Sequence, residues 1–178
     1  MFYCTSAVEY LFASYPPDTS FMKLATFEYY HGVVLTKLLR MDSRVTLTLV
    51  ESRPKESWAT YVINDDIALT IVHSANPRDV SQKPQGTSWT FQIQSVGNTV
   101  KQYRRFLALV GVQKEVGSAN AIICVLEPSQ ISELGLADKA GTLTIRKPTQ
   151  KGQLIVFKDK KQAMLIPQNA IETLELKP

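Results

Sequence analysis

An acidic pair stands between two stretches of β-type sequence, in YVINDDIALTIVHSA from Tyr61 to Ala75. Carboxylate oxygens are preferred ligands of Mg²⁺, and an ion held there would be able to activate water against a phosphodiester bond. Asn64, Asp65 and Asp66 are also residue types that tolerate the left-handed backbone of tight hairpin turns. Because neighbouring residues of a strand point to opposite faces, two adjacent acids rarely share one ion. The turn is the favoured interpretation, and the sequence predicts neither a metal site nor a cofactor.

The remaining catalytic residue types form no recognisable motif. The chain has two histidines, His31 and His73, and His31 lies three positions after Glu28, which makes the two neighbours on a helix. A half-buried helical histidine is the commoner case. The sequence contains no nucleophile elbow G-x-S-x-G and no glycine-rich phosphate loop. It therefore predicts no catalytic residues and favours a protein without enzymatic activity.

Basic residues cluster at two places in the sequence. The chain has 20 Lys and Arg against 16 Asp and Glu, which gives a net charge of +4. The candidate nucleic-acid contacts are Lys101, Arg104, Arg105, Lys158, Lys160 and Lys161. The first three share one face of a helix predicted over 98–111, and the others gather at the turn of a predicted hairpin. Cations grouped in this way are able to contact phosphates, although solvated surface charge is the commoner role.

The spacing of apolar residues predicts both helices and strands. Helices are predicted over 25–40, 98–111 and 128–135, and strands over 45–50, 58–63, 67–74, 89–93, 121–127, 142–147, 153–158 and 162–167. This order predicts an α/β fold, with a mixed sheet, flanking helices and a C-terminal β extension. We expect a single domain over 1–178. It would comprise an N-terminal extension (1–21), a mixed α/β core (22–136) and a small β unit (137–178).

The order helix, three strands, helix, strand over residues 25–127 resembles the core of the PD-(D/E)XK nuclease superfamily. The resemblance implies a restriction-endonuclease-like core in which Glu28 is the helical carboxylate of a Mg²⁺ site. This sequence departs from the motif on the third strand, where Thr70 replaces an acid and Val72-His73 replace a lysine. The Asp65-Asp66 pair lies at the distal end of the hairpin. The catalytic residues therefore do not carry over, and a nuclease whose catalytic residues have migrated is the alternative function.

The sequence also resembles an uncharacterised bacterial protein family. The resemblance consists of a YxxND hairpin, a serine after the next strand, and a W-x-F strand. The matching residues are Tyr61, Asn64, Asp65, Ser74, Trp89 and Phe91. This resemblance implies no activity.

Cysteine usage and hydropathy indicate the cellular compartment. The two cysteines, Cys4 and Cys124, are too few for a disulfide framework and fit a reducing cytoplasm. No apolar run approaches the ~18 residues of a membrane-spanning helix, so no membrane partner is expected. We therefore expect a cytoplasmic binding or accessory protein that is non-enzymatic and contacts nucleic acid. A further alternative is a homo-oligomeric structural subunit that assembles through apolar strand edges.

Overall fold

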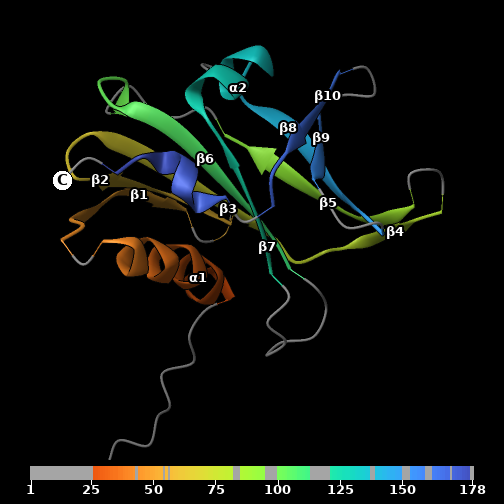
Figure 1. The fold of residues 1–178 in the computed structure, drawn as a ribbon, viewed down its shortest axis with the longest axis horizontal. Helices are drawn as coiled ribbons and strands as arrows, with labels where there is room; N and C mark the ends of the chain where they lie inside the picture. Colours follow the sequence, from red (N-terminus) through yellow and green to blue (C-terminus); the bar gives the residue numbers. More distant parts are fainter. Residues whose placement is uncertain are drawn as a thin grey trace, which may run out of the picture.

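The computed structural model describes residues 26–42, 44–53, 55, 57–81, 85–94, 100–112, 121–136, 139–149, 153–158, 162–168 and 170–176. Within these ranges the strands form two five-stranded sheets, and helix α1 covers one face of the first sheet (Figure 1). The helical elements are α1 (Thr26–Met41), α2 (Pro128–Glu133) and the 3₁₀ helix η3 (Ile171–Leu174). The fold is mixed α/β, as the sequence predicts, and most of it is sheet. The predicted extension over 1–21 lies outside the described residues.

The first sheet has the strand order β1-β2-β3-β6-β7. Its strands are β1 (Leu47–Arg53), β2 (Trp58–Ile63), β3 (Ile67–Ser74), β6 (Arg104–Gly111) and β7 (Ile122–Leu126). Neighbouring strands are antiparallel except β3 and β6, which are parallel. The Asn64-Asp65-Asp66 turn joins β2 to β3, and Asn64 and Asp65 both have a φ of 51°. The predicted hairpin and its turn are therefore confirmed.

The helix predicted over 98–111 is wrong, because residues 104–111 form β6, an interior strand of the first sheet. Its apolar residues Phe106, Leu107 and Val110 fit a helical period, but the run from Phe106 to Val110 is unbroken and buried throughout. Strand β6 pairs with β3 along one edge and with β7 along the other. Its two faces are covered because its residues alternate between the two hydrophobic cores, Leu107 and Leu109 in one and Phe106, Ala108 and Val110 in the other. The sequence of a strand buried on both faces is a continuous apolar run. Periodicity alone does not distinguish such a run from a buried helix.

The second sheet has the order β10-β9-β8-β5-β4 and is antiparallel throughout. Its strands are β4 (Arg78–Val80), β5 (Gly86–Ile93), β8 (Gly141–Pro148), β9 (Leu154–Lys158) and β10 (Gln162–Ile166). Residues 137–178 thus contribute three strands to a sheet that they share with β4 and β5. Strand β4 lies where the sequence indicated only a loop.

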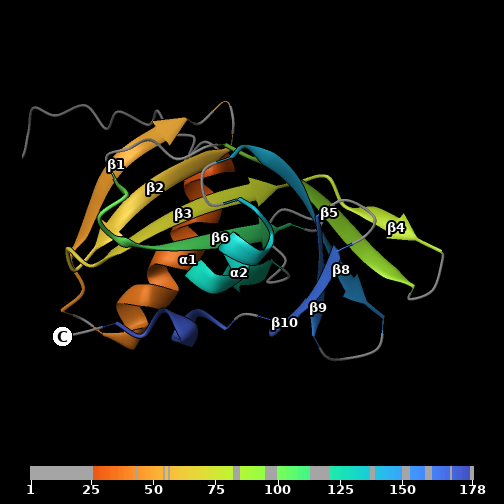
Figure 2. The same cartoon turned by 90° about the horizontal axis from the view of Figure 1, so that it is seen from above.

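Hydrophobic cores lie on both faces of the first sheet. Between the two sheets, the core includes Trp58, Trp89 and Leu109, each at most 1% exposed. On the opposite face, α1 packs on the first sheet through a second cluster of buried residues. Figure 2 shows α1 crossing behind the strands of the first sheet, with the second sheet to one side. One face of α1 is therefore committed to the core and the other faces outward.

Candidate functional site

The inner face of α1 is set by residues at helical spacing. Tyr30, Val34 and Leu38 recur every four residues and are all buried against the first sheet. His31 is buried beside them and faces His73 of β3, while Val33 and Leu35 are partly buried at the edges of this face. Thr36 and Arg40 are exposed on the opposite side of the helix. This arrangement leaves the side of α1 that carries Gly32 and Thr36 facing outward.

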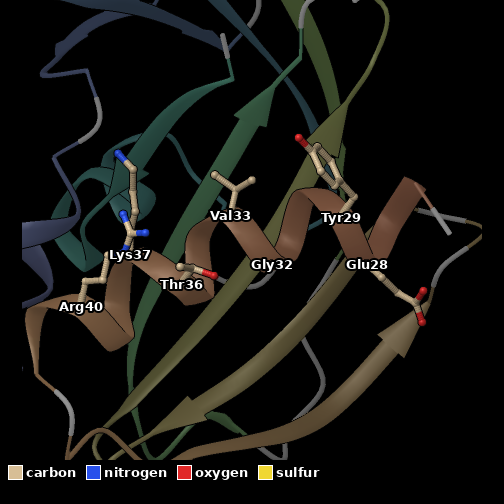
Figure 3. A pocket seen from close by; sticks show the side chains of 7 residues that line it. All are labelled: Glu28, Tyr29, Gly32, Val33, Thr36, Lys37 and Arg40. Atoms are coloured by element: carbon tan, nitrogen blue, oxygen red, sulfur yellow. The ribbon is translucent and has the colours of Figure 1, made fainter. Parts of the chain in front are cut away.

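A hollow of about 450 Å³ lies on the outer face of α1. We call its lining the α1 surface, and it consists of Glu28, Tyr29, Gly32, Val33, Thr36, Lys37 and Arg40. Figure 3 shows Gly32 near the middle, with Glu28 towards one end of the helix and Lys37 and Arg40 towards the other. A Cβ atom added at Gly32 would meet no atom within 4 Å. The missing side chain of Gly32 therefore opens the helix surface at the centre of the hollow.

Large apolar side chains are exposed on and beside this helix. On α1, Tyr29 and Leu39 are each 46% exposed and Met41 is 39% exposed. On the edge strand β1, Leu49 is 55% exposed and Val50 is 38% exposed. Single exposed apolar residues are common, whereas a contiguous apolar patch is typical of an interaction site. Of the exposed residues on α1, Tyr29 lines the hollow, and Leu39 lies two turns after Gly32 on the same side of the helix. The signal was present in the sequence, because Tyr29 and Gly32 lie outside the stripe formed by Tyr30, Val34 and Leu38.

A histidine pair lies under α1, where the helix meets the sheet. The ring centroids of His31 on α1 and His73 on β3 are 5.8 Å apart, and the rings are nearly perpendicular. Tyr30 lies 5.3 Å from His73, and Tyr61 lies 6.3 Å from His31, between ring centroids. Aromatic rings thus surround the pair, in a position where water has little access to His31, which is 1% exposed.

The environment of the pair disfavours its protonated forms. Burial lowers the pKa of His31 to about 4, with a further contribution from His73 and an opposing one from the Ser57 backbone. Burial also lowers the pKa of His73, again opposed by the Ser57 backbone. Both imidazoles are therefore neutral near pH 7. Among the described residues, no three His, Cys, Asp or Glu side chains come together as metal ligands.

The acids of the central hairpin have structural roles. Asp66 Oδ2 accepts hydrogen bonds from Arg104 Nη2 at 2.6 Å and from Arg104 Nε at 3.1 Å. Asp65 is exposed at the turn. Thr70, where the nuclease resemblance calls for an acid, is buried with its hydroxyl 3.0 Å from that of Thr60 on β2. Asp66 therefore joins the hairpin to β6, and the Thr60–Thr70 pair links its two strands.

The predicted cationic patch on residues 101–105 is not formed as expected. Because Arg104 and Arg105 are consecutive residues of β6, their side chains lie on opposite faces of the sheet. Arg104 pairs with Asp66, and Arg105 Nη1 donates a hydrogen bond to the Leu136 carbonyl at 3.2 Å. Lys101 is exposed in the turn that precedes the strand. The three cations therefore do not share one surface.

The second predicted cluster is described only in part. Lys158, at the end of β9, donates a hydrogen bond from Nζ to the Gly135 carbonyl at 3.2 Å. Lys160 and Lys161 lie outside the described residues. The strands β9 and β10 pair as the predicted hairpin. Nothing in the described part of this hairpin directs its charges towards a common ligand.

The chain was compared with protein-family models, curated proteins and solved structures, and none of them matched. In the described part of the chain, no helix is long and apolar enough to cross a membrane. The function is therefore inferred from the geometry of the α1 surface.

Proposed function

We propose that this chain is a non-enzymatic binding protein and that the α1 surface is where its partner docks. The observation that carries this proposal is the hollow around Gly32 on a helix that also exposes Tyr29 and Leu39. Tyrosine and arginine are enriched at protein interfaces, and the α1 surface supplies Tyr29 and Arg40. An apolar centre bordered by charges of both signs is the usual anatomy of a protein-binding site.

A protein partner fits this surface better than a nucleic acid does. The α1 surface carries one acid, Glu28, against two bases, Lys37 and Arg40, which is a weak field for a polyanion. Of the basic residues singled out from the sequence, Arg104 and Arg105 are engaged in bonds within the fold. Binding to nucleic acid would therefore depend on dispersed single charges, whereas Tyr29, Gly32 and Val33 adjoin one another on α1.

A photoreactive residue placed in the hollow tests the proposal. We suggest p-benzoylphenylalanine at Thr36, which lines the hollow and is exposed, with the exposed Lys139 as the matched control position. Irradiation in the native host is expected to give covalent adducts, with this chain or another protein, at Thr36 and not at Lys139. Equal labelling at the two positions, or no protein adduct at Thr36, would contradict the proposal.

We predict that the purified protein does not cleave DNA or RNA with Mg²⁺ or Mn²⁺. A metal-dependent nuclease needs converging carboxylates, and the buried hydroxyl pair of Thr60 and Thr70 stands where the nuclease resemblance calls for an acid. The measurement is plasmid nicking over hours at micromolar protein. Nicking that requires the metal and disappears in the Glu28→Gln variant would show that the nuclease alternative is right.

A further inference from the structure

We propose that the outer edge of β10 binds an extended, acidic peptide segment of another protein, which adds to the second sheet as a further strand. This site is separate from the α1 surface and goes beyond the function proposed above. An edge strand presents backbone N–H and C=O groups that no neighbouring strand satisfies. Peptides bind such edges by continuing the hydrogen-bond ladder of the sheet, which is the mode called β-strand addition.

The other sheet edges are protected against such pairing. Strand β1 has a bulge between Leu49 and Glu51, and β4 is only three residues long and includes Arg78 and Asp79. Strand β7 is buried along its whole length and contacts both β10 and η3. Bulges, charged residues, short length and coverage by other elements are the usual protections of an edge.

The described part of β10 has neither a bulge nor a charged residue. Residues 162–166 read Gln-Ala-Met-Leu-Ile, without a charge or a proline. They pair with β9 at five consecutive positions in regular register. Figure 2 shows β10 at the end of the second sheet, and no other described strand pairs with it. This edge is therefore a regular, uncharged strand to which another strand is able to pair.

The outward side chains near this edge are apolar. Met164 packs against the core between the sheets, so Ala163 and Leu165 lie on the outer face, where both are exposed. Leu165 is 60% exposed. In the register with β9, Ala163 lies opposite Phe157 and Leu165 lies opposite Ile155. An added strand would therefore place one of its side chains beside Leu165, in a cross-strand pair that continues this apolar row.

The charge of this part of the sheet favours an acidic partner. Strands β8, β9 and β10 carry Arg146, Lys147 and Lys158 and no acid. The guanidinium carbon of Arg146 lies 5.1 Å from the centroid of the Phe157 ring, and Lys158 bonds a neutral carbonyl oxygen, so both side chains keep their positive charge. In the sequence, residues 141–166 contain six bases and one acid, whereas the whole chain has a net charge of only +4. The excess positive charge of the chain is thus concentrated in this segment.

The same charges disfavour a second copy of the chain as the occupant. Two β10 edges paired with each other would bring two positively charged sheets side by side. Because neighbouring strands are about 4.8 Å apart, the cations of β8 and β9 lie within about 10 Å of the edge. That distance is about the Debye length at 0.1 M salt, so repulsion of a basic strand and attraction of an acidic one both act at low salt.

A synthetic peptide of about eight alternating glutamate and valine residues is the probe. Fluorescence anisotropy at about 20 mM salt measures its binding. Five paired residues make a small interface, so we expect a dissociation constant on the order of 100 μM. The same peptide with lysine in place of glutamate should bind at least about tenfold more weakly. An acidic peptide with a central proline should lose a similar factor, because proline removes a donor from the ladder.

Leu165→Glu on β10 and Thr90→Glu on β5 form a matched pair of variants. Both residues are exposed on the outer face of the second sheet and both changes add the same charge, but only Leu165 adjoins the edge. Leu165→Glu should weaken binding of the acidic peptide at least about tenfold, and Thr90→Glu less than about threefold. Ala163→Glu, also at the edge, should repeat the loss. Equal weakening by the first two variants, or no binding of the acidic peptide, would overturn the inference.

Amide hydrogen exchange identifies the bonds that form. Strand addition gives partners to the outward N–H groups of β10, so alternate amides of residues 162–166 should exchange at least about tenfold more slowly with the acidic peptide bound. The amides of β4, at the opposite edge, are the internal control.

Two further outcomes would show that the edge has a different occupant. If a single-stranded oligonucleotide binds as tightly as the acidic peptide and neither slows exchange in β10, the sheet is a general polyanion surface and the inference is wrong. If sedimentation of the chain alone shows a dimer that Leu165→Glu abolishes, the edge pairs with a second copy, and the inference is again wrong.

Discussion

Replacing Trp89 with alanine is expected to lower the free energy of unfolding by about 3–5 kcal/mol. Trp89 lies on β5 and is 1% exposed in the core between the two sheets. A Cβ atom added at Gly111 of β6 would lie 2.8 Å from its Cδ2 atom, so the ring rests directly on the backbone of the first sheet. Removing the ring leaves a cavity that close-packed strands cannot fill.

A lost hydrogen bond adds to the cost of the cavity. Trp89 Nε1 donates to the carbonyl oxygen of Val112 at 2.8 Å. Without the indole that buried acceptor is left unsatisfied, at a cost of about 1–3 kcal/mol that forms part of the total. Because whole domains are stable by only about 5–15 kcal/mol, Trp89→Ala removes a large share of the stability.

Urea unfolding followed by circular dichroism measures this effect. Thr90→Ala on the same strand is the matched control, since Thr90 is exposed and should change stability by less than about 0.5 kcal/mol. Trp89→Phe keeps most of the ring volume but loses the hydrogen-bond donor. Its loss of unfolding free energy should therefore lie between those of Trp89→Ala and Thr90→Ala. A Trp89→Ala protein as stable as Thr90→Ala would show that the sheets do not pack through this ring.

The free energy of unfolding is expected to fall by up to about 3 kcal/mol through His31 alone as the pH is lowered from 6.5 to 4. Burial, with a further contribution from His73, lowers the pKa of His31 from 6.5 to about 4 in the folded protein. Between these values the unfolded chain binds a proton that the folded chain does not, so acid favours unfolding. Each pKa unit is worth about 1.4 kcal/mol. This loss of unfolding free energy is complete below pH 4 and absent above about pH 7.

The measurement is urea unfolding at several pH values for the wild type and His31→Phe. Carboxylates titrate in both proteins. The difference between the two slopes of unfolding free energy against pH therefore isolates the contribution of His31. The variant should lose less stability than the wild type between pH 6.5 and 4. In the wild type, the His31 ring resonance should stay at its neutral shift down to about pH 5. An imidazole that titrates near 6.5 would show that His31 is in contact with water.

Local features of the structure follow from the sequence by itself. The hairpin strands β2 and β3 have the predicted bounds, because the turn residues Asn64 and Asp65 accept left-handed backbone and the flanking runs favour strands. Helix α1 also lies where its apolar spacing predicts, one residue from the expected end. In these segments the local residue preferences and the burial in the folded protein favour the same secondary structure. Short-range sequence patterns are therefore sufficient to predict it.

The candidate site is only partly a consequence of sequence pattern. Gly32 is visible in the sequence as a residue that weakens a helix, but its importance depends on which side of α1 faces out. That side is set by the burial of Tyr30, Val34 and Leu38 on the sheet. The histidine pair combines a residue of α1 with one of β3, 42 positions later in the chain. No spacing along the sequence indicates that the two rings meet.

Tertiary structure alone decided the conformation of residues 104–111. It thereby also decided that the predicted cationic patch of Lys101, Arg104 and Arg105 does not form. As a helix this segment would present Arg104 and Arg105 together on one solvated face. Pairing with β3 and β7 instead buries Phe106 to Val110 on both faces of a sheet and sends the two arginines to opposite sides. The local preference for helix in such a run is worth at most a few tenths of a kcal/mol per residue. Burial of each large side chain between strands is worth about 1.5–3 kcal/mol, and so the long-range pairing determines the structure.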